Sequence, residues 1–133
     1  MSKRPGFALA VFILSVAVGA AAAAQSGFSR EILQRADLSA AGHEAVTAVA
    51  VFQPGGIAAR HTHPGEEIGY VLEGEIVVDE DGKAPATFHA GQAFIIPAGT
   101  IHGAHNATGR VARIVATYVV EKGKPLATPA SLD

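Results

Sequence analysis

The 133-residue sequence contains no cysteine. Disulfide bonds and thiolate metal sites, including structural zinc sites of the cysteine type, are therefore excluded. A domain without these cross-links must derive its stability from its core, from a ligand or from self-association. Basic residues are also few, with 10 Lys and Arg against 12 Asp and Glu, and they form no cluster beyond the N-terminus. Without a basic patch, no nucleic-acid partner is expected.

The first 24 residues have the three parts of a secretory signal peptide. Lys3 and Arg4 precede an apolar run, and small residues follow it up to Ala22 and Ala24. The strongly apolar part, residues 7–18, is shorter than the roughly 20 residues of a spanning helix. We expect cleavage after Ala24 and a periplasmic or secreted protein without stable membrane insertion. The alternative is an uncleaved N-terminal anchor, because uncharged alanines lengthen the run.

The chain that remains after cleavage has the size of one domain. Residues 25–45 form a lead-in that is either a short amphipathic helical turn or an extended segment, since its apolar residues keep neither period. Residues 46–120 form the main domain. Residues 121–133 contain two prolines and little to bury, so they are expected to lie on the surface or to reach a neighbour.

Short runs rich in Val, Ile, Phe and Thr begin near residue 46, and turn residues interrupt them about every ten positions. This pattern is typical of an all-β sandwich or barrel. No long helix is predicted. The expected strands cover residues 46–53, 57–63, 67–72, 74–79, 86–89, 93–96, 101–106 and 110–120. Eight strands suit a closed jelly-roll β-barrel.

Two histidines stand one residue apart in the stretch GGIAARHTHPGEEIGYVLEG, residues 55–74. Because successive side chains of a strand point to opposite faces, His61 and His63 share one face and a single ion could bind both. The Pro-Gly turn that follows reverses the chain and returns the carboxylate of Glu67 towards the pair. Glu66 is the rival ligand, but strand alternation favours Glu67 and leaves Glu66 in solvent.

A fourth ligand comes from the stretch GQAFIIPAGTIHGAHN, residues 91–106, in which His102 begins a strand after a tight turn. By alternation His105 points away from His102 and is not expected to be a ligand. Asn106 shares the face of His102. It is either a hydrogen-bonding group of the cavity or a turn residue.

These two stretches resemble the two motifs of the cupin superfamily. The spacings match at every defining position, and 16 residues separate the motifs, which is close to the shortest gap in the family: Gly55-x5-His61-x-His63-x3-Glu67-x6-Gly74 and Gly91-x5-Pro97-x-Gly99-x2-His102-x3-Asn106. The resemblance implies a small single-domain jelly roll that holds one divalent metal through His61, His63, Glu67 and His102. Cupins include dioxygenases, isomerases, decarboxylases, binding proteins and storage proteins, and fold does not select among them.

Three imidazoles and one carboxylate suit borderline first-row transition metals better than calcium or magnesium, which prefer oxygen ligands. Mn, Fe, Ni, Zn and Cu are all compatible with this donor set. Four protein ligands would leave up to two octahedral positions for water, O₂ or a substrate, as a catalytic ion requires.

The strand that carries Glu67 is apolar on its opposite face, where alternation places Ile68, Tyr70 and Leu72. An apolar outer face needs a cover, either the N-terminal segment or a second subunit. Cupins commonly dimerise through such a face, and we expect a homodimer.

The available residues predict a small, mainly apolar pocket for a small organic substrate, with Arg60 and Arg113 as the nearest basic residues. The expected function is that of a metal-dependent oxidoreductase, dioxygenase-like, with Glu67 as the catalytic base. The alternatives are a non-catalytic periplasmic module that binds a metal or a small ligand, and a metal-dependent isomerase.

Overall fold

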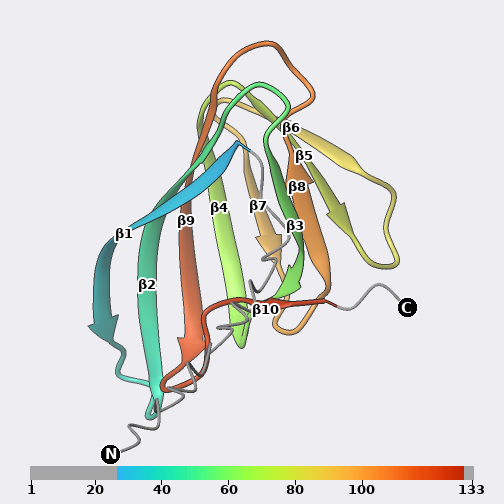
Figure 1. Cartoon of the computed structure of the whole chain (residues 1–133). Coiled ribbons are helices and arrows are strands. Elements are labelled where there is room, and N and C mark those ends of the chain that lie inside the picture. The colour runs from blue at the N-terminus through green and yellow to red at the C-terminus, as the bar shows by residue number, and fades with distance from the viewer. Residues whose placement is uncertain (1–26, 131–133) are drawn as a thin grey trace, which may run out of the picture.

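A computed structural model describes residues 27–130, and its regular structure consists of β-strands (Figure 1). The strands are β1 (Phe28–Asp37), β2 (His43–Phe52), β3 (Ile57–Thr62), β4 (Gly65–Glu73), β5 (Glu75–Glu80), β6 (Ala86–His89), β7 (Ala93–Ile96), β8 (His102–His105), β9 (Ala112–Glu121) and β10 (Thr128–Pro129). Among residues 27–130 we find no helical segment with the length and hydrophobicity of a membrane span. The expected signal peptide, residues 1–24, lies outside the described residues, as do the last three residues of the tail.

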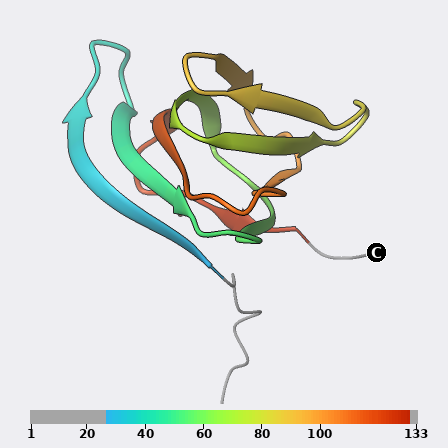
Figure 2. The same ribbon diagram turned by 90° about the horizontal axis from the view of Figure 1, so that it is seen from above.

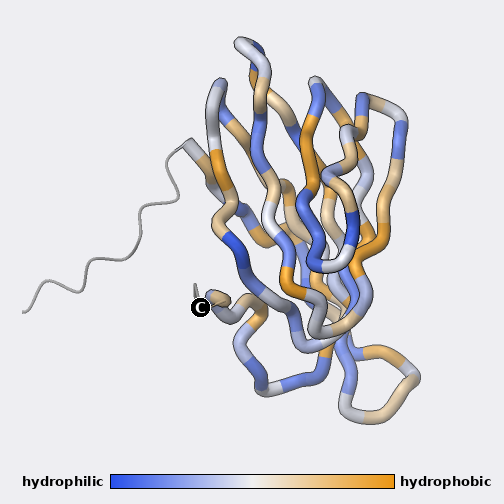
Figure 3. The backbone as a smooth tube through the Cα atoms, turned by 90° about the vertical axis from the view of Figure 1, so that its right-hand side faces the viewer, coloured by the Kyte–Doolittle hydropathy of each residue, from blue (hydrophilic) through white to orange (hydrophobic). Residues whose placement is uncertain are grey.

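The strands form two five-stranded antiparallel sheets. The order is β1-β2-β9-β4-β7 in one sheet and β10-β3-β8-β5-β6 in the other. Seen from above, the two sheets curve around a common interior (Figure 2). Alternate residues of β2, β4 and β9 are buried, and hydrophobic and hydrophilic positions alternate along the strands (Figure 3). The core is therefore the space between the two inner faces.

The fold class predicted from the sequence is confirmed: the protein is an all-β jelly roll. Each of the eight expected strands is present, two with identical bounds and six with ends shifted by one to three residues.

The lead-in, which the sequence left undecided, contains the ten-residue strand β1. It pairs along its length with β2, and the register shifts between Ile32 and Gln34. A bulge of this kind puts one extra residue into the strand, so apolar residues lose their two-residue period there. The strand is held by pairing with a distant segment, which a local pattern does not reveal.

The described part of the C-terminal tail pairs with a strand of the same chain. Thr128 and Pro129 of β10 pair with Thr62 and His61 of β3, and Figure 1 shows the tail crossing one end of the barrel. The next amide, that of Ala130, donates a hydrogen bond to the carbonyl of Arg60. The tail thereby contacts the strand that carries the first predicted ligands.

The outer face of β4 is apolar, as predicted, and it is exposed in the single chain. Ile68, Tyr70 and Leu72 are between 42% and 51% exposed, and Ile95 on the neighbouring β7 is 60% exposed. Strand β1 does not cover them, because it pairs with β2 and extends the opposite edge of the sheet.

Candidate metal centre

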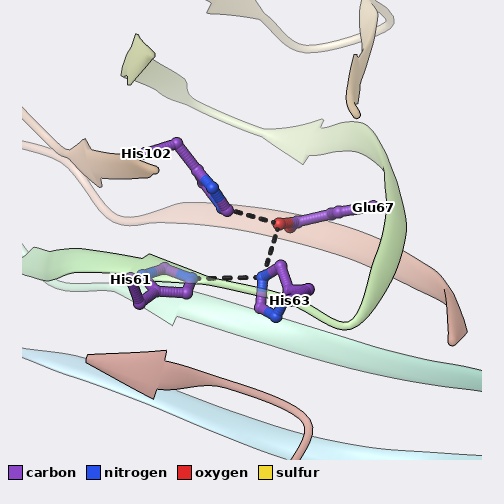
Figure 4. A group of neighbouring side chains, drawn as sticks. All are labelled: His61, His63, Glu67 and His102. Carbon is purple, nitrogen blue, oxygen red and sulfur yellow. Dashed lines mark hydrogen bonds and ion pairs between the residues drawn. The ribbon is translucent and has the colours of Figure 1, made fainter. Parts of the chain in front are cut away.

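The structure brings the four predicted ligands together between the two sheets (Figure 4). His61 lies on β3 directly opposite His102 at the start of β8, and His63 follows the end of β3. Glu67 comes from β4 of the other sheet. One ligand atom from each of the four residues lies within 4.8 Å of all the others. All four residues are at most 9% exposed.

Backbone carbonyls set the tautomer of all three histidines. The Nδ1 atoms of His61, His63 and His102 lie 2.6, 2.6 and 2.9 Å from the carbonyl oxygens of Ala59, Leu126 and Thr100. Because a carbonyl only accepts hydrogen bonds, each Nδ1 must carry a proton and donate it. In the neutral imidazole the Nε2 atom is then the lone-pair donor, as in metal-binding histidines held by outer partners.

These Nε2 atoms converge on one another and on the Glu67 carboxylate. His63 Nε2 lies 3.1 Å from His61 Nε2 and 3.0 Å from Glu67 Oε2, and His102 Nε2 lies 3.1 Å from the same oxygen. Lone pairs facing each other in a buried site repel unless a cation, either a proton or a metal ion, lies among them. The donor set therefore fits a divalent transition metal.

Two of the pKa values place their groups in the form that binds metal. Burial lowers the pKa of His61 to about 4, against the opposing hydrogen bond to Ala59, so His61 is neutral at pH 7. Burial alone would raise the pKa of Glu67, but hydrogen bonds with His102 and His63, which require a proton on their Nε2 atoms in the metal-free protein, outweigh it and lower the pKa to about 2. Glu67 is therefore ionised at neutral pH.

The tail completes this centre, a role that the sequence did not predict. Leu126 accepts the hydrogen bond from His63 through its carbonyl, and its side chain packs against the part of the core that contains Tyr118. An outer partner of this kind orients the imidazole and raises its basicity.

Deleting residues 125–133 is therefore expected to weaken metal binding about 10- to 100-fold, the usual cost of losing an outer partner. Competition with a chromophoric chelator measures the affinity, and circular dichroism checks that the barrel remains folded. Deleting only residues 131–133 is the control, because it keeps Leu126 and β10. Equal affinities for the two truncated proteins would contradict the role of Leu126.

A small pocket leads to the centre. Its cavity volume is about 30 Å³, and His61, Glu67 and His102 form part of its wall. Most of the remaining wall is apolar, as predicted: Phe28, Ala50, Phe52, Ala58, Ile76, Val78, Phe94, Ala104 and Ile114. A cavity of this size admits only a small ligand.

Two polar residues of the wall, Arg30 and Tyr118, were missed from the sequence. Tyr118 pairs with Glu67 across β9 and β4, and its ring centroid lies 4.6 Å from that of His63. The alternation of β9 could have revealed it, because Tyr118 shares a face with small buried residues. Burial and the charge of Glu67 raise the pKa of Tyr118, so its hydroxyl stays protonated and able to donate.

The other polar residues that the sequence suggested as possible site residues lie outside the ligand cluster and the pocket wall. Asn106 is buried as a turn residue and does not line the pocket; its amide donates to the carbonyls of Phe52, Gln53 and Arg110. Glu66 is exposed, and His105 contacts Asp79 outside the ligand cluster.

The two basic residues named from the sequence are also absent from the pocket wall. Arg60 and Arg113 form ion pairs with Asp81 and Glu73 instead.

The chain matches the model of a known protein family. The family model described as "Cupin domain" matches residues 48–123. The HTH-type transcriptional regulator PuuR of Escherichia coli (strain K12) is 40% identical over 70 residues, which is 50% of this chain and 36% of PuuR. The chain thus spans about a third of the length of the curated relatives that it matches.

Two solved structures have a similar fold. A recombinant oxalate oxidase in complex with glycolate has a TM-score of 0.63 and 24% identity, covering 80% of this chain and 57% of that one. The polyketide cyclase RemF of Streptomyces resistomycificus has a TM-score of 0.64 and 24% identity, covering 81% and 74%. At this identity they share the fold alone. Since the family model matches more than half of the chain and the jelly roll carries the expected ligand cluster, the protein belongs to the cupin domain family.

Proposed function

We propose that this protein is a metal-dependent oxidoreductase of the dioxygenase type that acts on a small organic compound. The observation that carries the proposal is the convergence of three imidazole Nε2 atoms and one carboxylate in a cluster of which His61, Glu67 and His102 line a small, mainly apolar pocket. A ligand cluster that served only to stabilise the fold would have no need to face such a pocket.

His61, His63, Glu67 and His102 would hold one divalent ion, with Mn, Fe, Ni, Zn and Cu as the compatible metals. The general affinity order favours Cu and Zn. When bound, a redox-active ion supplies Lewis acidity to a substrate oxygen and a reaction partner for O₂.

The residues around the centre would bind and position the substrate. Apolar side chains such as Phe94 and Ile114 exclude water from the pocket. Glu67 is the only carboxylate among the described residues that line it, so we assign proton abstraction to Glu67. Tyr118, whose raised pKa keeps its proton at neutral pH, would donate a hydrogen bond to a substrate oxygen.

Oxygen uptake by the Fe-, Mn-, Ni- and Cu-loaded protein with a panel of phenols and 1,3-diketones tests this proposal. We expect metal-dependent turnover that falls by at least about 100-fold in Glu67→Gln, because the change removes a metal ligand together with the assigned base. Glu66→Gln is the control, since Glu66 is exposed on the opposite face. Tight binding of a test compound without oxygen uptake in any metal form would contradict the enzyme proposal.

The second candidate is a non-catalytic module that binds a metal or a small ligand. The similarity to PuuR favours it, because that relative is a transcriptional regulator and the shared region covers about half of this chain. The oxygen-uptake experiment separates the two functions, since a binding module binds the test compound without consuming oxygen.

Export to the periplasm or the medium is also part of the proposal. It rests on the basic, apolar and small-residue parts of residues 1–24. N-terminal sequencing of the protein purified from its native cells should begin at Gln25. A mature chain that keeps Lys3 and Arg4 would instead support the uncleaved anchor.

We further propose that a second copy of the chain covers the outer face of β4 and β7. This face presents Ile68, Tyr70, Leu72 and Ile95, and apolar patches of this kind mark interaction surfaces. Light scattering should show a dimer that Leu72→Glu converts to a monomer. Leu33→Glu, at an exposed apolar position of β1, is expected to remain dimeric, and a monomeric wild-type protein would contradict the proposal.

A further inference from the structure

The guanidinium of Arg30 lies in the pocket because of the way β1 pairs with β2. Phe28 is opposite Phe52 and Arg30 is opposite Ala50 in the register. Paired residues of neighbouring strands project on the same side of the sheet, and Phe52 and Ala50 are buried core residues. Arg30 therefore projects inward beside Phe28, and both residues line the pocket that holds the ligand cluster.

Aromatic rings position this guanidinium. Its Cζ lies 5.3 Å from the ring centroid of Tyr118 and 5.7 Å from that of Phe28. The Tyr118 ring in turn contacts the ring of His63. The cation is thus held one aromatic ring away from the metal ligands, by cation–π contacts that leave its N–H groups free to donate.

Arg30 has no anionic partner among residues 27–130. Three other arginines of this range, Arg35, Arg60 and Arg113, form ion pairs with acidic side chains. The Nε atom of Arg30 is buried and makes no hydrogen bond. The pocket wall offers only one carboxylate, Glu67, and that group is engaged by His63 and His102. Arg30 is partly buried, and an unpaired cation beside apolar groups makes the site complementary to an anion.

We infer that Arg30 is the specificity-determining residue of the pocket and that the natural ligand is a small carboxylic acid whose carboxylate pairs with the guanidinium. A carboxylate matches the fork of an Arg side chain in charge and geometry. The apolar wall fits an aromatic or short aliphatic body attached to it. This inference rests on the proposed function for the use of the pocket and specifies the substrate class.

The probes are four carboxylates, namely benzoate, salicylate, pyruvate and 2-hydroxyisobutyrate, each compared with its uncharged amide. Binding to the full mature domain is measured by calorimetry in both the zinc-loaded and the metal-free forms. We expect at least one carboxylate to bind about 10- to 100-fold more tightly than its amide, the usual effect of a charge-assisted hydrogen bond. The metal-free form should retain this preference, because it arises from Arg30.

Arg30→Gln should remove the preference. The binding affinity for the carboxylate should fall about 10- to 100-fold, and the affinity for the amide should not change. Arg30→Lys should retain part of it. Arg35→Gln on the same strand is the matched control, because Arg35 pairs with Glu44 on the surface, and it should bind like the wild type. Near-ultraviolet circular dichroism and metal content verify that each variant is folded.

Equal affinity for carboxylates and amides, carboxylate binding unaffected by Arg30→Gln, or no binding of any probe would overturn the inference. These results are distinguishable from failure of the proposed function. A protein without oxygen uptake could still select carboxylates through Arg30, and a protein with oxygen uptake could show no such selection.

Discussion

Replacing His102 by alanine is expected to lower metal affinity by at least about 100-fold, because even an outer-shell partner costs about 10- to 100-fold and His102 is an inner ligand in this account. Its Nε2 atom contributes one of the four converging donors, and it bridges the two sheets through Glu67. Elemental analysis of the reconstituted, dialysed protein measures the metal that remains. We expect His61→Ala to behave in the same way.

His105→Ala is the matched control for this loss. His105 lies on the same strand, β8, but contacts Asp79 and is outside the ligand cluster. It should retain the metal content of the wild type. Equal metal contents in His102→Ala and His105→Ala would show that the metal, if any, binds elsewhere.

The largest effect on stability is expected for Gly65→Ala. Gly65 begins β4 two residues before Glu67, and a Cβ atom there would overlap the carbonyl oxygen of Val119 and lie 2.7 Å from the Cα of Val120. Both atoms belong to the backbone of β9, so the two strands would have to separate. The free energy of unfolding should fall by about 3 kcal/mol or more, as for severe overpacking. Urea denaturation of the metal-free protein measures the change.

Gly109→Ala provides the comparison. A Cβ atom at Gly109 would meet no atom within 4 Å, so its stability should stay within about 0.5 kcal/mol of the wild type. A mild effect at Gly65, similar to that at Gly109, would mean that β4 and β9 do not approach as closely as described. The position of Glu67 would then also be in doubt.

The ligand cluster was predictable because its geometry depends on short-range rules. Alternation that continues one residue beyond the end of β3 places His61 and His63 together, and a turn directly before β4 returns Glu67 to them. The apolar outer face of β4 could be predicted from the same alternation. His102 could be predicted as a ligand only from the second motif, whose spacing places His102 just after a turn.

Other parts of the site depend on contacts between distant segments. Arg30 reaches the pocket only because β1 pairs with β2, and the bulge near Ile32 hides this strand from a periodicity analysis. Leu126 supports His63 through a backbone carbonyl, a group that every residue has, so no side-chain pattern marks it. The sequence could not decide between the two roles of Asn106, because a buried turn residue and a cavity residue have the same spacing.

Anomalous diffraction from crystals of the metal-reconstituted protein, recorded at the absorption edge of the added metal, tests the central claim most directly. We predict one anomalous peak per chain, at bonding distance from the Nε2 atoms of His61, His63 and His102 and from a carboxylate oxygen of Glu67. For zinc the metal–nitrogen distances should be about 2.0–2.1 Å. No peak among these four side chains, or a peak bound only by other residues, would contradict the account.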